Sequence, residues 1–318
     1  MRLRLDPFIL GLLATAAVAT VVPAEGDALA VLRVVGTVAI GLLFFLYGAR
    51  LSTPETLDGI RHWRLHLTIL GTTFVVFPAV GLACGLWVPE VVGDDLYAGF
   101  LLLCLVPSTV QSAVAYTSIV RGNVSGAVVS ASLSSMIGVV LTPVLVGVLL
   151  SGAGGATVDG GAVLSILAQL LAPFVLGQLL RPLIGRWVAR HDPRLRLVDR
   201  GSILLVVFLA FSAGSNQGVW DELTAAELGL VVALCLGLLA LMLSWTRAIG
   251  RWAGFDRGDR WAITFCGTQK SLATGLPMAA VLFADDRVAL VILPLMLYHQ
   301  AQLVVSAWLA ARATPPRR

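Results

Sequence analysis

The sequence predicts an all-α integral membrane protein with ten transmembrane helices. Of its 318 residues, 58% are apolar and only 13% are charged, and the mean hydropathy of +0.91 lies far outside the range of soluble globular proteins. Apolar runs of roughly 17 to 25 residues recur along the chain, and each could cross about 30 Å of hydrocarbon as a helix. No stretch is left over for a soluble domain. The expected spans are 7–23, 29–50, 65–88, 95–120, 124–150, 162–181, 201–219, 226–247, 260–283 and 287–311.

The charges of successive connections alternate in sign. Arginines gather at both termini and in every second connection, whereas the connections between them carry mostly Asp and Glu. By the positive-inside rule, we expect a multi-pass protein of the inner cell membrane with both termini in the cytoplasm. The net charge of +4 is thereby explained by orientation in the lipid bilayer, and no nucleic-acid partner is expected. The sequence leaves the oligomeric state open.

The first apolar run has two readings. A basic start at Met1 to Arg4 precedes it, as in a signal peptide that is cleaved. We prefer a retained helix, because an even number of spans is needed to bring both termini to one side. The four cysteines lie inside apolar segments without the spacing of a zinc site or a disulfide framework, so we interpret them as packing residues and expect no cofactor.

Ten spans divide into two halves of five, expected at 1–155 and 156–318, and an odd number per half means that a duplicated half inserts upside down. Two polar islands indicate such a duplication: Pro107–Ser112 in span four and Gly267–Ser271 in span nine. Gly, Pro and small polar side chains suit a helix that breaks at membrane depth, where freed N–H and C=O groups need partners. Matching interrupted spans are typical of a transporter binding site. Close helix packing by small residues is the alternative.

Lys270 is the only lysine of the chain, and it lies in the second island. A charge at membrane depth is costly and usually marks a functional site. All 18 carboxylates fall in predicted connections or at helix ends, so we expect no ion pair for Lys270 within the chain. Three options stay open: pairing with an anionic substrate, loss of the proton on desolvation, or reach into a polar cavity. The broken helix also offers free N–H groups to an anion.

Further polar side chains occur at mid-membrane depth in spans five and ten. Ser130 and Ser134 share one helical face, as do Tyr298 and Gln302, so each pair could line a cavity. Serines that hydrogen-bond to their own helix are the alternative. His62 and His66, at the start of span three, are expected at the membrane interface. No catalytic motif is present, and an enzyme is not expected.

At the two islands the chain resembles the bile acid:sodium symporter superfamily, and more closely its SBF-like branch, which is related to solute-carrier family 10 member 7. The resemblance covers the whole ten-span plan. It implies two inverted five-helix repeats, a panel of spans 1, 2, 6 and 7, a core of spans 3–5 and 8–10, and spans four and nine unwound where they cross. The segments that carry it are VPSTVQS (106–112), YTSIVRGNV (116–124), SASLSS (130–135), FCGTQKSLATGLPM (265–278) and LPLMLYHQ (293–300).

Site residues follow from this resemblance position by position. Ser112 and Gln269 match sodium ligands, although Ala113 replaces the asparagine that follows the first, and His299 matches a histidine of the substrate cavity. The family's acidic sodium ligand falls on Phe265, and Lys270 replaces a substrate-side asparagine. The span-five hydroxyl ligands fall on alanines, which leaves Ser130 and Ser134 as displaced candidates. The expected substrate-binding residues are Lys270, His299, Gln111, Ser271 and Gln300, and the candidate ion-binding residues are Ser112, Gln269, Thr268, Ser130 and Ser134.

The expected function is secondary transport of a small organic anion by alternating access, with its substrate not specified by the sequence. Sodium beside a lysine ammonium would meet repulsion of several kcal/mol at about 4 Å and an effective dielectric near 20. Lys270 is therefore expected either to replace one sodium ion as a fixed cation, or to titrate and couple transport to protons. The coupling ion thus stays open between sodium and a proton.

Two other classes of function remain as alternatives to transport. The first is a non-transporting membrane regulator of calcium homeostasis or envelope biosynthesis. The second is a photoreceptor in which Lys270 forms a Schiff base, although such a protein needs an intramembrane carboxylate as counter-ion and seven spans.

Overall fold

The computed structural model describes residues 7–50, 62–150 and 160–313, and these residues form helices and no strand. The predicted all-α fold is thereby confirmed for the described residues. Among the described residues, six helices are long and apolar enough to span a membrane, or seven if the bent pair Asp94–Leu105 and Val110–Ile119 counts as one span. Ten spans and inverted repeats remain predictions.

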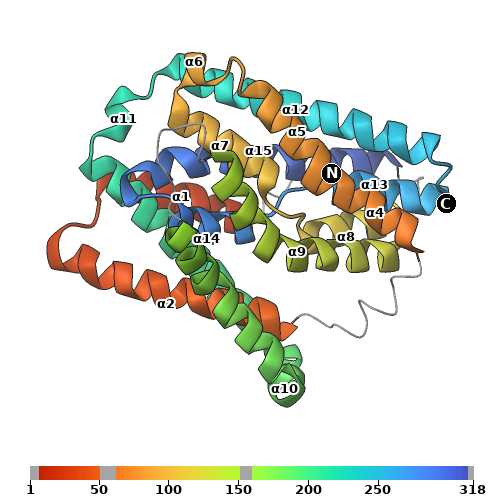
Figure 1. The fold of residues 1–318 in the computed structure, drawn as a ribbon, viewed down its shortest axis with the longest axis horizontal. Coiled ribbons are helices and arrows are strands. Elements are labelled where there is room, and N and C mark those ends of the chain that lie inside the picture. Colours follow the sequence, from red (N-terminus) through yellow and green to blue (C-terminus); the bar gives the residue numbers. More distant parts are fainter. Residues whose placement is uncertain (1–6, 51–61, 151–159, 314–318) are drawn as a thin grey trace. The chain divides into compact units, whose positions relative to one another are not determined.

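The described residues divide into two compact units, each built from separate stretches of the chain. The first unit is a helical layer whose members come mainly from the red and green parts of the ribbon in Figure 1. It contains α1 (Pro7–Val21), α2 (Gly26–Arg50), α10 (Gly160–Asn216), α11 (Val219–Glu222) and the stretch Leu276–Ile292.

Helices α2 and α10 of the first unit pack at unusually short range. A Cβ atom placed on Gly48 would lie 2.0 Å from the carbonyl oxygen of Phe174, and one on Gly177 would lie 2.1 Å from the carbonyl oxygen of Phe45. Each helix therefore presents a glycine to the backbone of the other. This is the small-residue packing that brings helix backbones together in membranes.

The structure corrects the predicted boundary between spans six and seven. We expected separate helices at 162–181 and 201–219 with an arginine-rich connection, but α10 runs through the whole region. The charged residues made this region polar, as expected, but Arg, Leu and Ala are also good helix formers. A proline inside a helix can kink it without ending it. The prolines inside α10 are Pro173, Pro182 and Pro193.

Ion pairs also hold this polar part of α10 against the end of α2. The guanidinium of Arg50 lies 3.2 Å from a carboxylate oxygen of Asp192 and 2.5 Å from one of Asp199. These pairs connect the last residue of α2 to two aspartates of α10 that lie about two helical turns apart. The arginine-rich segment therefore has partners within its own unit.

The second unit contains both polar islands. The π-helical turn η2 interrupts the third predicted span between α4 and α5, and two further spans are broken, as described next. The elements of the second unit are α4 (Trp63–Gly71), η2 (Thr72–Val76), α5 (Phe77–Cys84), α6 (Pro89–Val92), α7 (Asp94–Leu105), α8 (Val110–Ile119), α9 (Val124–Leu150), α12 (Ala225–Trp252), α13 (Arg257–Thr268), α14 (Leu272–Leu282) as far as Gly275, and α15 (Asp285–Ala313) from Leu293.

The predicted interruptions of spans four and nine are confirmed. Helices α7 and α8 are separate and bent by 57° at their break, where Val106 has extended backbone. Helices α13 and α14 are likewise separate, and Gln269 between them is extended. Every residue from Leu96 to Leu105 of α7 is buried, so the first break lies deep within this unit.

Candidate functional site

Lys270 lies in the break between α13 and α14, and its side chain is fully buried. Its Nζ donates to the carbonyl oxygens of Thr73 (3.1 Å), Cys104 (3.0 Å) and Val106 (2.9 Å). The ring centroid of Phe77 lies 4.0 Å from the same nitrogen, within range of a cation–π interaction. An ammonium has three N–H bonds, and each of them has an acceptor here.

The π-helical turn explains why the carbonyl of Thr73 is free. The N–H of Phe77 donates to the oxygen of Thr72, five residues back, so the next bond of this pattern would come from residue 78. Residue 78 is a proline, which has no N–H to donate. The Thr73 oxygen is consequently left without its helical donor, and Lys270 supplies one.

The break in span four frees the other two carbonyls. In a regular helix the oxygen of Cys104 would accept from the N–H of Ser108. That N–H instead donates to Oγ of Ser134, at 3.0 Å, because Pro107 and the extended Val106 turn the chain away. The oxygens of Cys104 and Val106 therefore lie at the open C-terminal end of α7, where the helix dipole also favours a positive charge.

The backbone of Lys270 is held by α15. Gln302 accepts from the Lys270 N–H through Oε1 (2.7 Å) and donates to its carbonyl through Nε2 (2.9 Å). Nδ1 of His299 lies 3.2 Å from the same carbonyl and 2.8 Å from the Gln302 amide nitrogen. One glutamine thus satisfies both backbone groups that the broken helix leaves open at this residue.

The two breaks are also hydrogen-bonded to each other. The N–H of Ser271 donates to the carbonyl of Pro107 at 2.8 Å, and the hydroxyl of Ser108 donates to the carbonyl of Cys266 at 2.7 Å. Each break therefore provides acceptors and donors to the other. The two polar islands are thus in direct contact, as expected from the sequence.

A series of hydrogen bonds between side chains also runs through the crossing of the two broken helices. The hydroxyl of Ser112 donates to Oε1 of Gln269 at 2.6 Å, and Nε2 of Gln269 donates to the hydroxyl of Ser306 at 3.1 Å. Tyr298 donates to the carbonyl of Thr268 at 2.7 Å. The hydroxyl of Thr268 itself donates within its own helix, so Thr268 contributes its backbone to the crossing.

The candidate residues fall into two groups by position. Ser134 reaches the crossing through Ser108, but Ser130 instead lies 2.7 Å from Nδ1 of His66. Gln111 is exposed, and the amide of Gln300 is buried without a hydrogen-bond partner among the described residues. The candidates that meet at the crossing are Lys270, Ser271, His299, Ser112, Gln269, Thr268 and Ser134.

The structure adds to two expectations from the sequence. His66, expected at the membrane interface, is buried within the protein with only 4% of its surface exposed, and Nδ1 of its ring lies 2.7 Å from the hydroxyl of Ser130 in α9. The three options for Lys270 omitted backbone carbonyls, which are the partners that the structure shows. Among the described residues no carboxylate forms an ion pair with Lys270. Pro78 and Pro107 were the available sequence signals, since each removes a helical donor.

The surroundings of Phe265 are apolar. Its ring is fully buried and packs against the rings of Tyr116 and Trp261, with centroids 5.7 Å and 5.6 Å away. Within the described residues, no group of three or more His, Cys, Asp or Glu side chains is arranged to hold a metal ion. The place where the family resemblance puts an acidic ligand therefore carries no charge.

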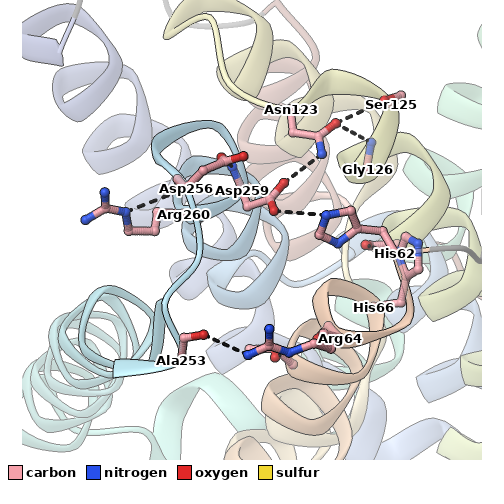
Figure 2. Close-up of polar contacts among 12 residues, drawn as sticks. His62, Arg64, His66, Asn123, Ser125, Gly126, Ala253, Asp256, Asp259 and Arg260 are labelled. Atoms are coloured by element: carbon pink, nitrogen blue, oxygen red, sulfur yellow. Dashed lines mark hydrogen bonds and ion pairs between the residues drawn. The ribbon is translucent and has the colours of Figure 1, made fainter. Parts of the chain in front are cut away.

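A second buried charge lies at the opposite end of α13. The carboxylate of Asp259 has only 4% of its side chain exposed, and it accepts from Nδ2 of Asn123 at 2.7 Å and faces Nε2 of His62 at 3.3 Å. Figure 2 shows these three side chains converging from α13, the α8–α9 turn and the start of α4. Asp256 caps α13 by accepting from the N–H of Asp259. Side chains of three elements thus surround Asp259, whereas the Lys270 ammonium is surrounded by backbone carbonyls.

Comparison with known proteins gives the same family as the resemblance noted in the sequence. The model of the SBF-like CPA transporter family matches residues 6–314. An uncharacterised protein of Pseudomonas aeruginosa is 52% identical over 96% of this chain and 92% of its own length. "Putative symporter YfeH" of Escherichia coli is 45% identical over 97% of this chain and 92% of its own. "Sodium/bile acid cotransporter 7" of the rat is 28% identical over 98% and 95%. The chain therefore belongs to the SBF-like CPA transporter family, which makes it a membrane transporter and not an enzyme.

Proposed function

We propose that this protein is a secondary transporter that moves a small organic anion by alternating access, with the Lys270 ammonium as a fixed cation in place of one sodium ion. The observation that carries the proposal is the coordination of Nζ by three backbone carbonyls at the crossing of two broken helices. Rings of backbone carbonyls are ligands that replace the water shell of an alkali cation in other membrane proteins. Here a covalently attached ammonium uses such ligands.

Two further observations support a fixed cation. The position where the resemblance expects an acidic sodium ligand is the buried, apolar Phe265. The three acceptors also match the three N–H bonds of an ammonium, whereas a neutral amine would have only two to donate. Proton coupling through Lys270 is the competing version of this proposal, and it requires the third acceptor to lose its donor in each cycle.

The direct ligands of the anion in our proposal are two adjacent side chains of α15, His299 at the crossing and Gln300 next to it in the chain. All three donors of Lys270 are engaged, so its charge attracts the anion without a direct hydrogen bond in this conformation. Gln300 is the first proposed ligand, because both polar atoms of its amide are buried and have no hydrogen-bond partner among the described residues. His299, adjacent to Gln300 and within 3.2 Å of the Lys270 carbonyl, is the second proposed ligand.

Alternating access in this proposal uses the panel and core that the family resemblance implies. The composition of the two compact units supports it, since α1, α2 and α10 belong to one and both breaks belong to the other. The distribution of arginines supports an inner-membrane location with both termini in the cytoplasm. Sodium coupling at the Lys270 position is not part of the proposal.

Transport by purified protein in liposomes tests the proposal. We expect wild-type protein to carry an organic anion from a mixed panel into the liposomes, down its own concentration gradient, without a sodium gradient, and Lys270→Gly to lose at least tenfold in rate. Ethylammonium added to Lys270→Gly should restore part of the rate, because a small cation can return to the three carbonyls. A pH gradient that drives wild-type uptake by itself would favour the proton-coupled version.

Several outcomes would contradict the proposal. Accumulation that depends on a sodium gradient and proceeds equally well in Lys270→Ala would remove the role of Lys270. Absence of transport for any anion by folded protein would favour a non-transporting regulator. Lys270→Arg is a useful control for charge alone, since it keeps the cation but changes the geometry of its donors.

A further inference from the structure

An open groove of about 460 Å³ lies along one face of the second unit, apart from the crossing. Helix α4 and the turn η2 form one wall, and the C-terminal half of α12 forms the other. This volume is within the range of known ligand sites. The lining residues that matter for its chemistry are Trp63, Arg64, Leu67, Gly71, Val75 and Trp245.

The walls of the groove offer almost no polar groups to an occupant. The hydroxyl of Thr68 donates to the carbonyl of Arg64, and that of Thr72 donates to the carbonyl of Thr68, each at 2.8 Å. The indole N–H of Trp245 donates to the Thr72 hydroxyl at 3.2 Å. Since these groups already have partners, the length of the groove suits an apolar chain.

One end of the groove is different, because it carries a positive charge. The guanidinium of Arg64 donates one hydrogen bond of 2.9 Å to the carbonyl of Ala253 and lies over the ring of Phe255, 5.6 Å from its centroid. Figure 2 shows Arg64 extended toward Ala253 in this position. A guanidinium has five N–H donors, so an anion can still bind there. Trp63 beside it is 60% exposed, as expected for a side chain at the membrane interface.

The length of the groove matches one leaflet of a bilayer. From Arg64 to Val75 a helix rises roughly 16 Å, and half of the hydrocarbon thickness is about 15 Å. We propose that the groove binds one acyl chain of an anionic membrane phospholipid, whose phosphate pairs with Arg64. The occupant lies against η2, the turn whose Thr73 carbonyl holds Lys270.

The floor of the groove provides a clean test. A Cβ on Gly71 would have no atom within 4 Å, and its backbone is helical (φ −60°, ψ −41°), so Gly71→Leu can fill the groove without a clash. Gly237 of α12 has the same open space and is not part of the groove, which makes Gly237→Leu the matched control. Native mass spectrometry of the full chain, with phosphatidylglycerol titrated into detergent micelles, counts the bound lipids.

We expect Gly71→Leu to bind one phosphatidylglycerol fewer than the wild type, and Gly237→Leu to bind the same number. Arg64→Gln should weaken that one binding step about tenfold or more, as expected for loss of a charged hydrogen bond. Arg251→Gln, an exposed arginine outside the groove, should leave it unchanged. Phosphatidylcholine should bind more weakly than phosphatidylglycerol, while inorganic phosphate alone should not compete.

Three results would overturn the lipid site. The first is equal lipid binding by Gly71→Leu and the wild type, and the second is equal loss in the Gly237→Leu control. The third is a dimer in the native spectra that Gly71→Leu converts to monomer, because that would assign the groove to a second copy of the chain. Melting temperatures of the four variants establish that each is folded before lipids are counted.

Discussion

Helix α13 has a buried charge at each end, and the two are stabilised in different ways. Asp259 in its first turn is held by side chains, the amide of Asn123 and the imidazole of His62. Lys270, beyond its last residue, is held by backbone carbonyls. Both arrangements agree with the helix dipole, which favours an anion at the N-terminus and a cation near C-terminal carbonyls. The carboxylate is satisfied by two side chains, whereas the ammonium needs backbone carbonyls that are freed in two other spans.

The largest effect should come from removing the cation. Lys270→Met keeps the apolar length of the side chain but leaves three buried carbonyls without donors, so we expect the free energy of unfolding to fall by about 3 kcal/mol or more. Thermal unfolding of the purified protein in detergent measures this loss. Arg251→Met is the control for replacing an exposed cation with methionine. A melting temperature equal to that of the wild type would show that backbone coordination contributes nothing to stability.

Removing the anion should have a smaller effect that depends on what replaces it. Asp259→Ala leaves the buried amide of Asn123 without its acceptor, at a cost of about 2 kcal/mol. Asp259→Asn keeps a carbonyl oxygen and should recover more than half of that loss. The same thermal measurement on both variants tests the difference. If they were equally destabilised, the charge of Asp259 would matter more than its hydrogen bond.

A change at Pro78 should affect transport more than stability. Pro78→Ala restores an N–H that can compete for the Thr73 carbonyl, so Lys270 would lose one of its three acceptors. We expect about a tenfold lower transport rate, equivalent to about 1.4 kcal/mol, with little change in melting temperature. Pro143→Ala, inside α9, is the matched control. Unchanged transport would indicate that the π-helical turn does not tune the site.

The smallest effect is expected at His62. Its side chain is 51% exposed, and exposed ion pairs contribute little because water and salt screen them. His62→Gln should therefore cost less than about 1 kcal/mol in stability, against about 2 for Asp259→Ala. Thermal unfolding of both variants at low and high salt separates the salt-dependent contribution of His62 from the hydrogen bond between Asp259 and Asn123. A larger loss for His62 than for Asn123→Ala would reverse the ranking of the partners of Asp259.

Much of the architecture could be predicted from local patterns in the sequence. Apolar length and arginine distribution predicted a helical membrane protein, and the islands at 107–112 and 267–271 located both helix breaks. These features are local, because hydrocarbon length and missing proline N–H groups act on adjacent residues. The same locality explains the error in α10, where packing and the Arg50 ion pairs continue a helix through residues that composition alone marks as a connection.

The sequence by itself determined that a lone cation lies at membrane depth without a carboxylate to pair with it. Only the tertiary structure decided what holds that cation. The oxygens of Thr73, Cys104 and Val106 belong to two spans far from Lys270 in the chain. Pro78 and Pro107 mark places where a helix loses a donor, but every residue has a carbonyl, and side-chain identity does not show which free carbonyls meet at one cation. That depends on where neighbouring helices lose a donor and on how the folded spans bring those points around one ammonium.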